Sequence, residues 1–349
     1  MKKIMALAIA AMLCLSCLLT GCGDDRVTLN IYNWEDYIDE TVLDDFQAEH
    51  PEIKVNYERF STNEDMYNKL SKSNTKYDVL FPSDYMIEKM IDEGMLAKLD
   101  FSNIPNYQYI DEKFKNLDYD PNNEYSVPYM WGTLGILYNK KMVDETEIGW
   151  DILFGDKYKG QILMMDSVRD AMGASLKSLG YSLNSKNPAE IEAAKQKLID
   201  QKQILLAYGF DDIKDKMVAG EAAVALVYAG DALYSIKQNP DLVYAVPKEG
   251  SNLFFDAVVV PANSEHKKEA EMFIDFLCRT DVAKRNADYI EYYTIQTEAR
   301  KLMEEEDKGE MFAYPSDEEL ENCEIFTSLD DDTLRLYNDA WTQVTTATK

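Results

Sequence analysis

The sequence predicts an α/β protein made of two lobes. Short apolar or alternating runs typical of strands are interleaved with segments whose apolar residues recur at helical spacing, first over residues 27–94 and again over residues 161–277. Strands that alternate with helices favour a largely parallel sheet covered by helices. A chain of 349 residues is long enough to form two such units.

The first unit is expected to open with a strand at residues 27–32, where apolar and polar residues alternate. Residues 38–47 follow with apolar side chains at helical spacing, so a helix is expected there. The remaining expected elements are strands at residues 53–60 and 77–81, a helix that Ser61 or Thr62 caps and that runs through Leu70, and a helix that Ser83 caps and that ends at Gly94.

The second unit repeats this alternation. Its expected strands are residues 161–165, 222–228, 241–246 and 254–260, and its expected helices are residues 188–203 and 265–277. Pro261 ends the last strand because proline cannot donate to a sheet ladder. Ligands of open α/β sheets bind beyond the carboxyl ends of the strands, so the cleft between two such lobes is the expected pocket.

The first 22 residues read as a secretion signal. Lys2 and Lys3 precede an apolar run at residues 4–19, and the run ends in Leu-Thr-Gly before Cys22. This ending resembles the lipobox of bacterial lipoproteins, which implies removal of residues 1–21 and attachment of diacylglycerol and palmitate to Cys22. Residues 22–26 would then be a lipid-anchored tether. The alternative is an uncut membrane anchor, for which the apolar run is short.

The charge of the chain limits its partners. The formal net charge is −28, and it becomes more negative once the signal with its two lysines is removed. A chain this acidic repels nucleic acid and attracts cations to its clefts. We therefore expect no nucleic-acid partner. Taken alone, the acidity is better explained by a role in solubility.

Motifs that would indicate an enzyme, a cofactor or a metal site are missing from the sequence. There is no CxxC pair, no Cys/His cluster and no glycine-rich phosphate loop, so neither a metal nor a cofactor is expected. Cys278 and Cys323 remain in the mature chain besides Cys22; we expect ordinary thiols, with a disulfide between them left open.

Acidic and aromatic residues gather repeatedly at the ends of expected strands. The clusters are residues 32–37, 82–85, 129–132 (just before an expected crossing between the lobes), 166–170, 228–231 and 254–256. Taken alone, each is better explained by helix capping or core packing. Together they would bury several carboxylates, which is destabilising without a cation. A polyamine meets both features, because its ammonium groups pair with carboxylates and its methylenes lie against aromatic faces.

Longer motifs then identify a family. The sequence contains NWEDYI, YDVLFPSDYMIEKMIDEGML, DPNNEYSVPYMWGT, VPKEGSNLFFDAVVVPANS and YNDAW. Over nearly the whole mature chain it resembles the spermidine/putrescine-binding proteins of bacterial ABC importers, which have the type II periplasmic-binding-protein fold. The resemblance implies a ligand cleft between two discontinuous lobes, residues 27–133 plus about 257–312 and residues about 134–256 plus 313–349.

The resemblance also implies how such a protein works. A polyamine, putrescine or spermidine, is captured as the lobes close by a hinge motion. The closed protein, a monomer, then docks on an ABC permease whose ATPase drives uptake, and no reaction is catalysed. The expected location is the extracytoplasmic face of the cytoplasmic membrane, in a periplasm or at the cell surface, with the lipid on Cys22 as the anchor.

The family's ligand residues map onto this sequence one at a time. The implied set is Trp34, Asp36, Tyr37, Ser83, Tyr85, Asp170, Tyr228, Asp231, Phe254, Asp256 and Tyr292. Asp256 and Asp231 are expected to hold one ammonium group, and Asp36, Asp170 or both to hold the other. Trp34, Tyr85, Tyr228 and Phe254 are expected to line the methylenes.

Two departures from the family bear on ligand preference. Spermidine-type members carry two acids three residues apart where this chain has Ser167 and Asp170, and Tyr228 stands where the family usually has tryptophan. The set formed by Asp36, Asp231 and residues 254–256 favours putrescine or recognition of both polyamines.

Two other functions stay open at this point. The first is a binding protein of the same fold for an amino acid, a sugar or an iron chelate, with Arg169 as the basic residue that would pair with a carboxylate. The second is a surface enzyme such as a glycosidase, which would use paired carboxylates, Asp166 with Asp170 or Asp231 with Asp256.

Overall fold

The computed structural model describes residues 26–72, 75–210, 212–307 and 315–348. Its strands are β1 (Val27–Trp34), β2 (Ile53–Phe60), β3 (Val79–Leu80), β4 (Ser126–Asn139), β5 (Ile162–Met165), β6 (Ala207–Gly209), β7 (Val224–Tyr228), β8 (Leu242–Ala245), β9 (Leu253–Val259) and β10 (Tyr293–Thr294). Its helices are α2 (Thr41–Glu49), α3 (Asn63–Lys72), α4 (Asp84–Asp92), α5 (Val168–Ser178), α6 (Pro188–Gln201), α7 (Asp212–Val218), α8 (Ala229–Gln238), α9 (Lys267–Leu277), α10 (Thr280–Ile290), α11 (Thr297–Asp307), α12 (Asp317–Leu320) and α13 (Asp331–Thr346).

One mixed sheet runs through both lobes. In the described part of the chain it has ten strands in the order β2-β1-β3-β9-β4-β7-β5-β6, with β8 and β10 also paired to β4. The outer strands pair in parallel, β1 with β2 and β3, and β5 with β6 and β7. β4 and β9 are antiparallel to each strand that they pair with. The prediction of a largely parallel sheet is therefore wrong at the centre, where these two strands cross between the lobes.

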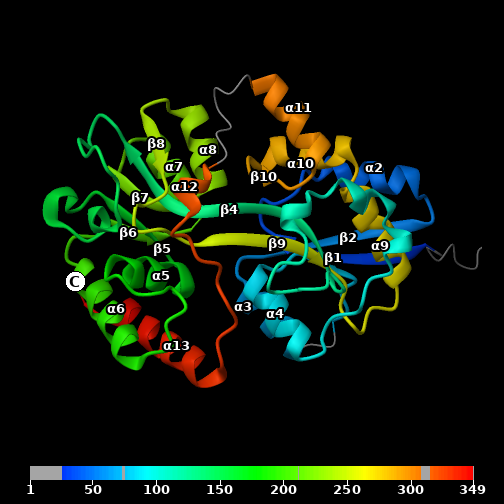
Figure 1. Ribbon diagram of the computed structural model, residues 1–349, viewed down its shortest axis with the longest axis horizontal. Helices are drawn as coiled ribbons and strands as arrows, with labels where there is room; N and C mark the ends of the chain where they lie inside the picture. Colours follow the sequence, from blue (N-terminus) through cyan, green and yellow to red (C-terminus); the bar gives the residue numbers. More distant parts are fainter. Residues whose placement is uncertain (1–25, 73–74, 211, 308–314, 349) are drawn as a thin grey trace, which may run out of the picture.

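Two hydrophobic cores flank this crossing. Figure 1 shows β4 and β9 running from one group of helices to the other. The first core joins β1 and β2 to α2, α4 and α9, and the second joins β5 and β7 to α5, α6 and α13. Along β4 the buried side chains belong to the first core up to Trp131 and to the second from Leu134. On this basis we propose residues 27–133 plus about 257–312 as one lobe and about 134–256 plus 313–349 as the other.

Local side chains explain where several elements begin. The strand predicted at residues 53–60 and the helix predicted from residue 188 both start there, the helix because Asn187 caps it by accepting the Ala189 N–H. The helix predicted at residues 38–47 instead begins at Thr41, since the Asp39 carboxylate accepts the Thr41 N–H in a turn. Residues 129–132 lie inside β4 and not before it.

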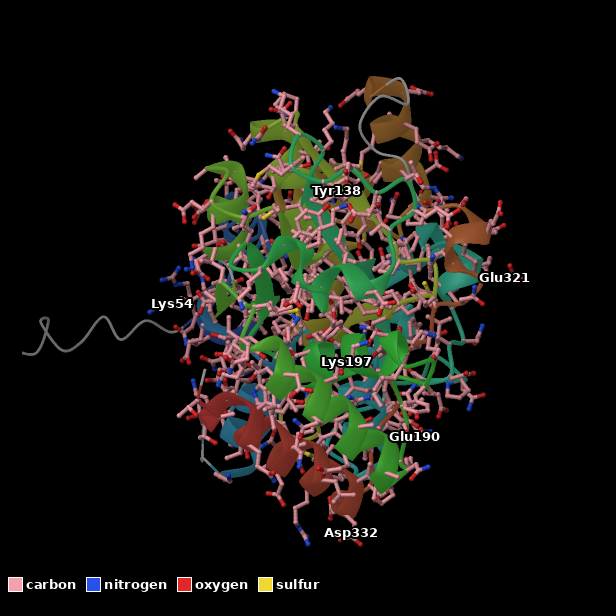
Figure 2. All side chains as sticks on the ribbon, turned by 90° about the vertical axis from the view of Figure 1, so that its left-hand side faces the viewer. Lys54, Tyr138, Glu190, Lys197, Glu321 and Asp332 are labelled. Carbon is pink, nitrogen blue, oxygen red and sulfur yellow. The ribbon has the colours of Figure 1, made fainter. Side chains whose placement is uncertain are left out.

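Charged side chains cover the outside of the molecule. Figure 2 shows this on one face, where Glu190 and Lys197 project from α6 and Asp332 from α13. Cys278 is buried and Cys323 half-buried, and both are free thiols, so the disulfide left open by the sequence is not formed. None of the described helices is both long and apolar enough to cross a membrane. Cys22 and the predicted signal at residues 1–21 lie outside the described residues.

Candidate functional site

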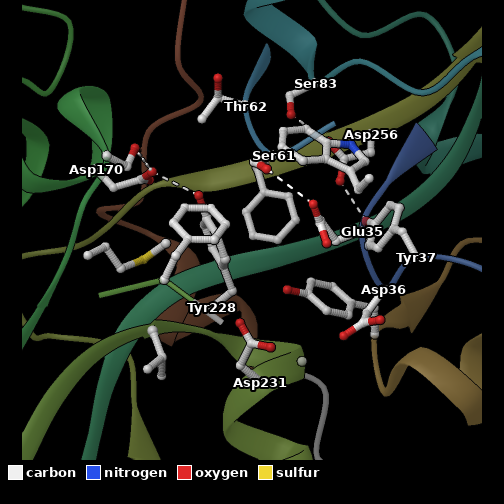
Figure 3. Close-up of a pocket in the computed structure, with 18 of the residues that line it drawn as sticks. Glu35, Asp36, Tyr37, Ser61, Thr62, Ser83, Asp170, Tyr228, Asp231 and Asp256 are labelled. Atoms are coloured by element: carbon white, nitrogen blue, oxygen red, sulfur yellow. Dashed lines mark hydrogen bonds between the residues drawn. The ribbon is translucent and has the colours of Figure 1, made fainter. Parts of the chain in front are cut away.

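A cavity of about 470 Å³ lies where the two lobes meet (Figure 3). Its walls come from the ends of β1, β5 and β7, from β9 and from helices of both lobes. Each ligand residue implied by the family resemblance lines it: Trp34, Asp36, Tyr37, Ser83, Tyr85, Asp170, Tyr228, Asp231, Phe254, Asp256 and Tyr292. The structure brings these side chains together, while their individual roles remain predictions.

Asp256 is a buried carboxylate that accepts a hydrogen bond from a hydroxyl group on each of its oxygens. It lies on β9, where Tyr37 Oη donates to its Oδ2 at 2.6 Å and Ser83 Oγ donates to its Oδ1 at 2.6 Å. Burial raises the pKa of this carboxyl to about 6, although both hydroxyl donors oppose the shift. Ser83 was expected to cap α4; it stands at the N-cap, but its hydroxyl is turned to Asp256.

Asp170 is a second buried carboxylate, and it lies on a helix of the second lobe. It lies in the first turn of α5, where Ser167 Oγ donates to its Oδ2 at 2.5 Å and Tyr228 Oη donates to the same oxygen at 2.8 Å. Burial raises the pKa of Asp170, with the two hydroxyls and the nearby Arg169 acting in the opposite direction. Ser167, which stands where the family resemblance implies a further acid, thus holds Asp170.

Asp36 and Asp231 form a third acidic position, and they do so together. Asp36 follows β1 in the first lobe, and Asp231 lies in the first turn of α8 in the second. Lys214 Nζ lies 3.5 Å from Asp36 Oδ2 and 3.8 Å from Asp231 Oδ1. The expected assignment puts Asp231 and Asp256 on one ammonium group and Asp36, Asp170 or both on the other, and it stays a prediction. The structure adds that Asp36 and Asp231 lie on either side of Lys214.

A chain of aromatic rings connects the two hydroxyl-bound carboxylates. The ring of Tyr228 lies 5.3 Å from that of Phe254, Phe254 lies 6.1 Å from Tyr292, and Tyr292 lies 5.3 Å from Tyr37. Its first and last members donate to Asp170 and Asp256. Tyr292 packs directly against the backbone of Gly230. A Cβ at this position would lie 1.9 Å from Tyr292 Cε2, so the close contact requires glycine.

Two further aromatic side chains are held in fixed orientations at the cavity wall. Trp34 Nε1 donates to the Phe81 carbonyl oxygen at 2.7 Å, and its ring lies 4.6 Å from that of Phe60. Tyr85 Oη donates to Glu64 at 3.0 Å and accepts from Asn63 Nδ2 at 3.1 Å. The cavity therefore offers a polar end at each carboxylate and apolar ring faces between.

The geometry can be compared with known proteins. Residues 41–313 match the bacterial extracellular solute-binding protein family, which is most of the chain. The chain belongs to this family. This solute-binding protein is 36% identical over 304 residues to the spermidine/putrescine-binding periplasmic protein of Escherichia coli (strain K12), covering 86% of this chain and 87% of that one.

Solved structures agree in fold. A Listeria monocytogenes protein assigned to a spermidine/putrescine ABC transporter is 41% identical, with a TM-score of 0.87 over 92% of this chain and 99% of that one. The spermidine/putrescine ABC transporter substrate-binding protein PotD of Streptococcus pneumoniae is 39% identical, with a TM-score of 0.78 over 93% of this chain and 100% of that one. The solute-binding protein thus has the two-lobed α/β fold of these proteins.

The charged cavity residues that the sequence did not single out include Glu64, Asp84 and Lys214. Glu64 lines the cavity, and burial raises the pKa of its carboxyl; it follows the second strand as closely as the predicted acids follow theirs, a signal that was available. Asp84 is fully buried and accepts the N–H groups of Tyr85 and Phe255, so it positions the wall. Lys214 carried no sequence signal.

The solute-binding protein presents its cavity carboxylates singly or in pairs. Among the described residues no group of three or more His, Cys, Asp or Glu side chains is placed to hold a metal ion. Asp170 and Asp256 accept hydrogen bonds from hydroxyl groups, and aromatic rings separate these two carboxylates. This arrangement suits a cation with an apolar body.

Proposed function

We propose that this solute-binding protein captures putrescine or spermidine and delivers it to the permease of an ABC importer, whose ATPase drives uptake. The protein itself catalyses no reaction. The observation that carries the proposal is that Asp170 and Asp256 are buried in an aromatic cavity with no described lysine or arginine nitrogen within 4.0 Å of either carboxylate. Buried carboxylates of this kind are stabilised when an outside cation pairs with them.

The chemistry of a polyamine fits each part of the cavity. One ammonium group would pair with Asp256, beside the Tyr37 and Ser83 hydroxyls that donate to this carboxylate. Another ammonium group would pair with Asp170. The methylenes between them would lie against Tyr228 and Phe254, where each cation–π contact adds roughly 0.5–2 kcal/mol. A micromolar site needs about 8 kcal/mol in total, which two enclosed ion pairs and several ring contacts supply.

An amino acid fits the cavity less well, because its carboxylate would need Arg169 or Lys214, and Lys214 is already paired with Asp36 and Asp231. The Arg169 guanidinium already donates to the Thr327 carbonyl oxygen at 3.3 Å and to Asn184 Oδ1 at 3.1 Å, and it stacks over the Phe326 ring at 4.2 Å. A ligand carboxylate would have to replace these contacts. The name of the Escherichia coli relative, spermidine/putrescine-binding periplasmic protein, supports the polyamine proposal.

Isothermal titration calorimetry of the purified mature domain tests this function. Putrescine, spermidine or both are expected to bind at pH 7.5 with one site and a micromolar or lower Kd, whereas glutamate, arginine and maltose are expected to give no saturable heat. The absence of saturable heat with both polyamines would refute the proposal, and so would saturable binding of an amino acid alone. Turnover of sugar substrates would instead point to the glycosidase alternative.

Lobe closure is the proposed route of delivery. We propose that the open protein closes by a hinge motion around β4 and β9 when a ligand joins Asp256, which Tyr37 and Ser83 of the first lobe hold, to Asp170 of the second lobe. The closed monomer would then dock on the permease. In this proposal Trp34, Tyr85, Tyr228 and Phe254 enclose the methylenes, as their positions at the cavity wall support.

The relatives named periplasmic place this family outside the cytoplasm. More narrowly, we propose that Cys22 carries the lipid that holds the mature chain to the outer face of the cytoplasmic membrane, because the Leu-Thr-Gly-Cys ending resembles a lipobox. Cells fed labelled palmitate are expected to label the wild-type chain and not the Cys22→Ala variant. Equal labelling of both chains would contradict the anchor.

A further inference from the structure

The four predicted ligand carboxylates of the cavity are of two kinds. Asp170 and Asp256 accept hydrogen bonds from hydroxyl groups and have no described lysine or arginine nitrogen within 4.0 Å. Asp36 and Asp231 share one ammonium group, which belongs to Lys214 of the same chain. One pair is thus open to a cation from outside, and the other pair already holds a cation.

The position of Lys214 is set by the second lobe. The lysine lies on α7, whose residues Ile213 and Met217 are buried in the second core. Its side chain is only 19% exposed, and Nζ lies 5.6 Å from the centre of the Tyr234 ring. Because Asp36 belongs to the first lobe, the Lys214–Asp36 ion pair crosses the cleft. An ammonium group between two acids and beside an aromatic ring has the surroundings that a polyamine end would have.

We propose that Lys214 occupies an ammonium position of the ligand cavity and so makes the site select diamines over triamines. This inference rests on the proposed polyamine function and names the ligand class within it. A lysine side chain is four methylenes that end in an ammonium group, the same chemistry as one end of a polyamine. A diamine pairs with Asp170 and Asp256 and leaves Lys214 in place.

A triamine has a third ammonium group, which we expect at Asp36 and Asp231, the two acids that Lys214 holds. This group must either displace the lysine from Asp36 and Asp231 or lie beside it, and two like charges at such a distance repel each other. The cost applies to spermidine and not to putrescine. Lys214 would thereby give the site a preference for putrescine over spermidine that the acids alone do not determine.

The test compares Lys214→Met with Lys216→Met by calorimetry with putrescine and spermidine. Methionine keeps the apolar stem and removes the charge. Lys216 lies on the same helix, pairs with Asp212 at 2.5 Å and does not line the cavity, so its replacement controls for lost charge on α7. We expect the wild type to prefer putrescine, Lys214→Met to raise spermidine affinity about tenfold or more while putrescine affinity changes less than about threefold, and Lys216→Met to change neither.

The other outcomes separate this inference from the function on which it rests. If spermidine affinity stays the same or falls in Lys214→Met, or if both ligands gain equally, the inference is wrong while polyamine binding stands. If neither ligand binds the wild type or either variant, the proposed function is wrong and the inference fails with it. Circular-dichroism melting of each variant shows that the compared proteins are folded.

Discussion

Replacing Asp256 with asparagine is expected to abolish polyamine binding and, at the same time, to stabilise the unliganded protein at pH 8. The loss of binding follows from removing one partner of an enclosed ion pair, which lowers affinity about 100-fold or more. The gain in stability follows from the pKa of Asp256, which burial raises from 3.8 to about 6. Titration calorimetry and thermal melting with and without putrescine measure the two effects.

The sign of the stability effect depends on the direction of that pKa shift. A carboxyl with a raised pKa favours folding while it is protonated, and this contribution is lost as the pH rises from about 4 through about 6. At pH 8 the buried charge therefore costs about 3 kcal/mol. Asparagine removes that cost. It cannot accept from both Tyr37 and Ser83 as the carboxylate does, and this loss reduces the gain in unfolding free energy by about 1 kcal/mol.

Asp120→Asn is the matched control for this prediction. Asp120 is also a buried aspartate, but it accepts the backbone N–H groups of Glu124, Tyr125 and Ser126 and does not line the cavity. Its replacement is expected to lower the melting temperature and to leave putrescine affinity unchanged. An Asp256→Asn protein that still binds putrescine within threefold of the wild type would show that Asp256 is not a ligand.

The acids of the cavity were predictable because of where strands end. Asp170 follows β5 and Asp231 follows β7, and these neighbouring strands carry their carboxyl ends to the same edge of the sheet. Their proximity to the first lobe is a consequence of the two-lobed fold, which the alternation of strands and helices already indicated. The hydroxyl partners were not predictable, because Ser83 reads equally well as a helix cap.

The central strand shows why the sheet was predicted incompletely. β4 has almost no alternation, since nearly all of its side chains are buried, and it contains Pro128 and two glycines. Proline and glycine weaken a strand signal, so no strand was predicted here and residues 129–132 were expected only just before a crossing. The direction of β4 and β9 depends on how the lobes are joined, which local patterns do not encode.

Lys214 was not predictable from any local feature. It lies in a helix of seven residues among several other charged side chains, a pattern typical of a solvated surface. Its contact with Asp36 joins segments far apart in the sequence and exists only because α7 and the loop after β1 meet across the cleft. Two opposite charges that come together only in the folded protein have no fixed separation in the sequence, so no sequence pattern reveals their contact.

Polyamine affinity is expected to fall about tenfold for each pH unit once the pH drops below about 6. Asp256 must be ionised to pair with an ammonium group, and its pKa is about 6 in the unliganded protein. The raised pKa of Asp170 adds to the loss at lower pH. The ligand contributes nothing to this dependence, because alkyl ammonium groups of the lysine type titrate near pH 10. Calorimetry at half-unit steps from pH 8 to pH 4.5 gives the profile.

Proton release identifies the titrating group as a participant in binding and separates it from a general effect of acid on the protein. A cation that favours the ionised carboxylate expels its proton, so binding at pH 6 is expected to release about half a proton per ligand and binding at pH 8 almost none. Titrations in two buffers with different ionisation enthalpies measure this number directly. Circular dichroism at pH 4.5 checks that the lobes remain folded. A Kd that stays flat from pH 8 to pH 4.5 in a folded protein would mean that the ligand does not pair with the buried carboxylates.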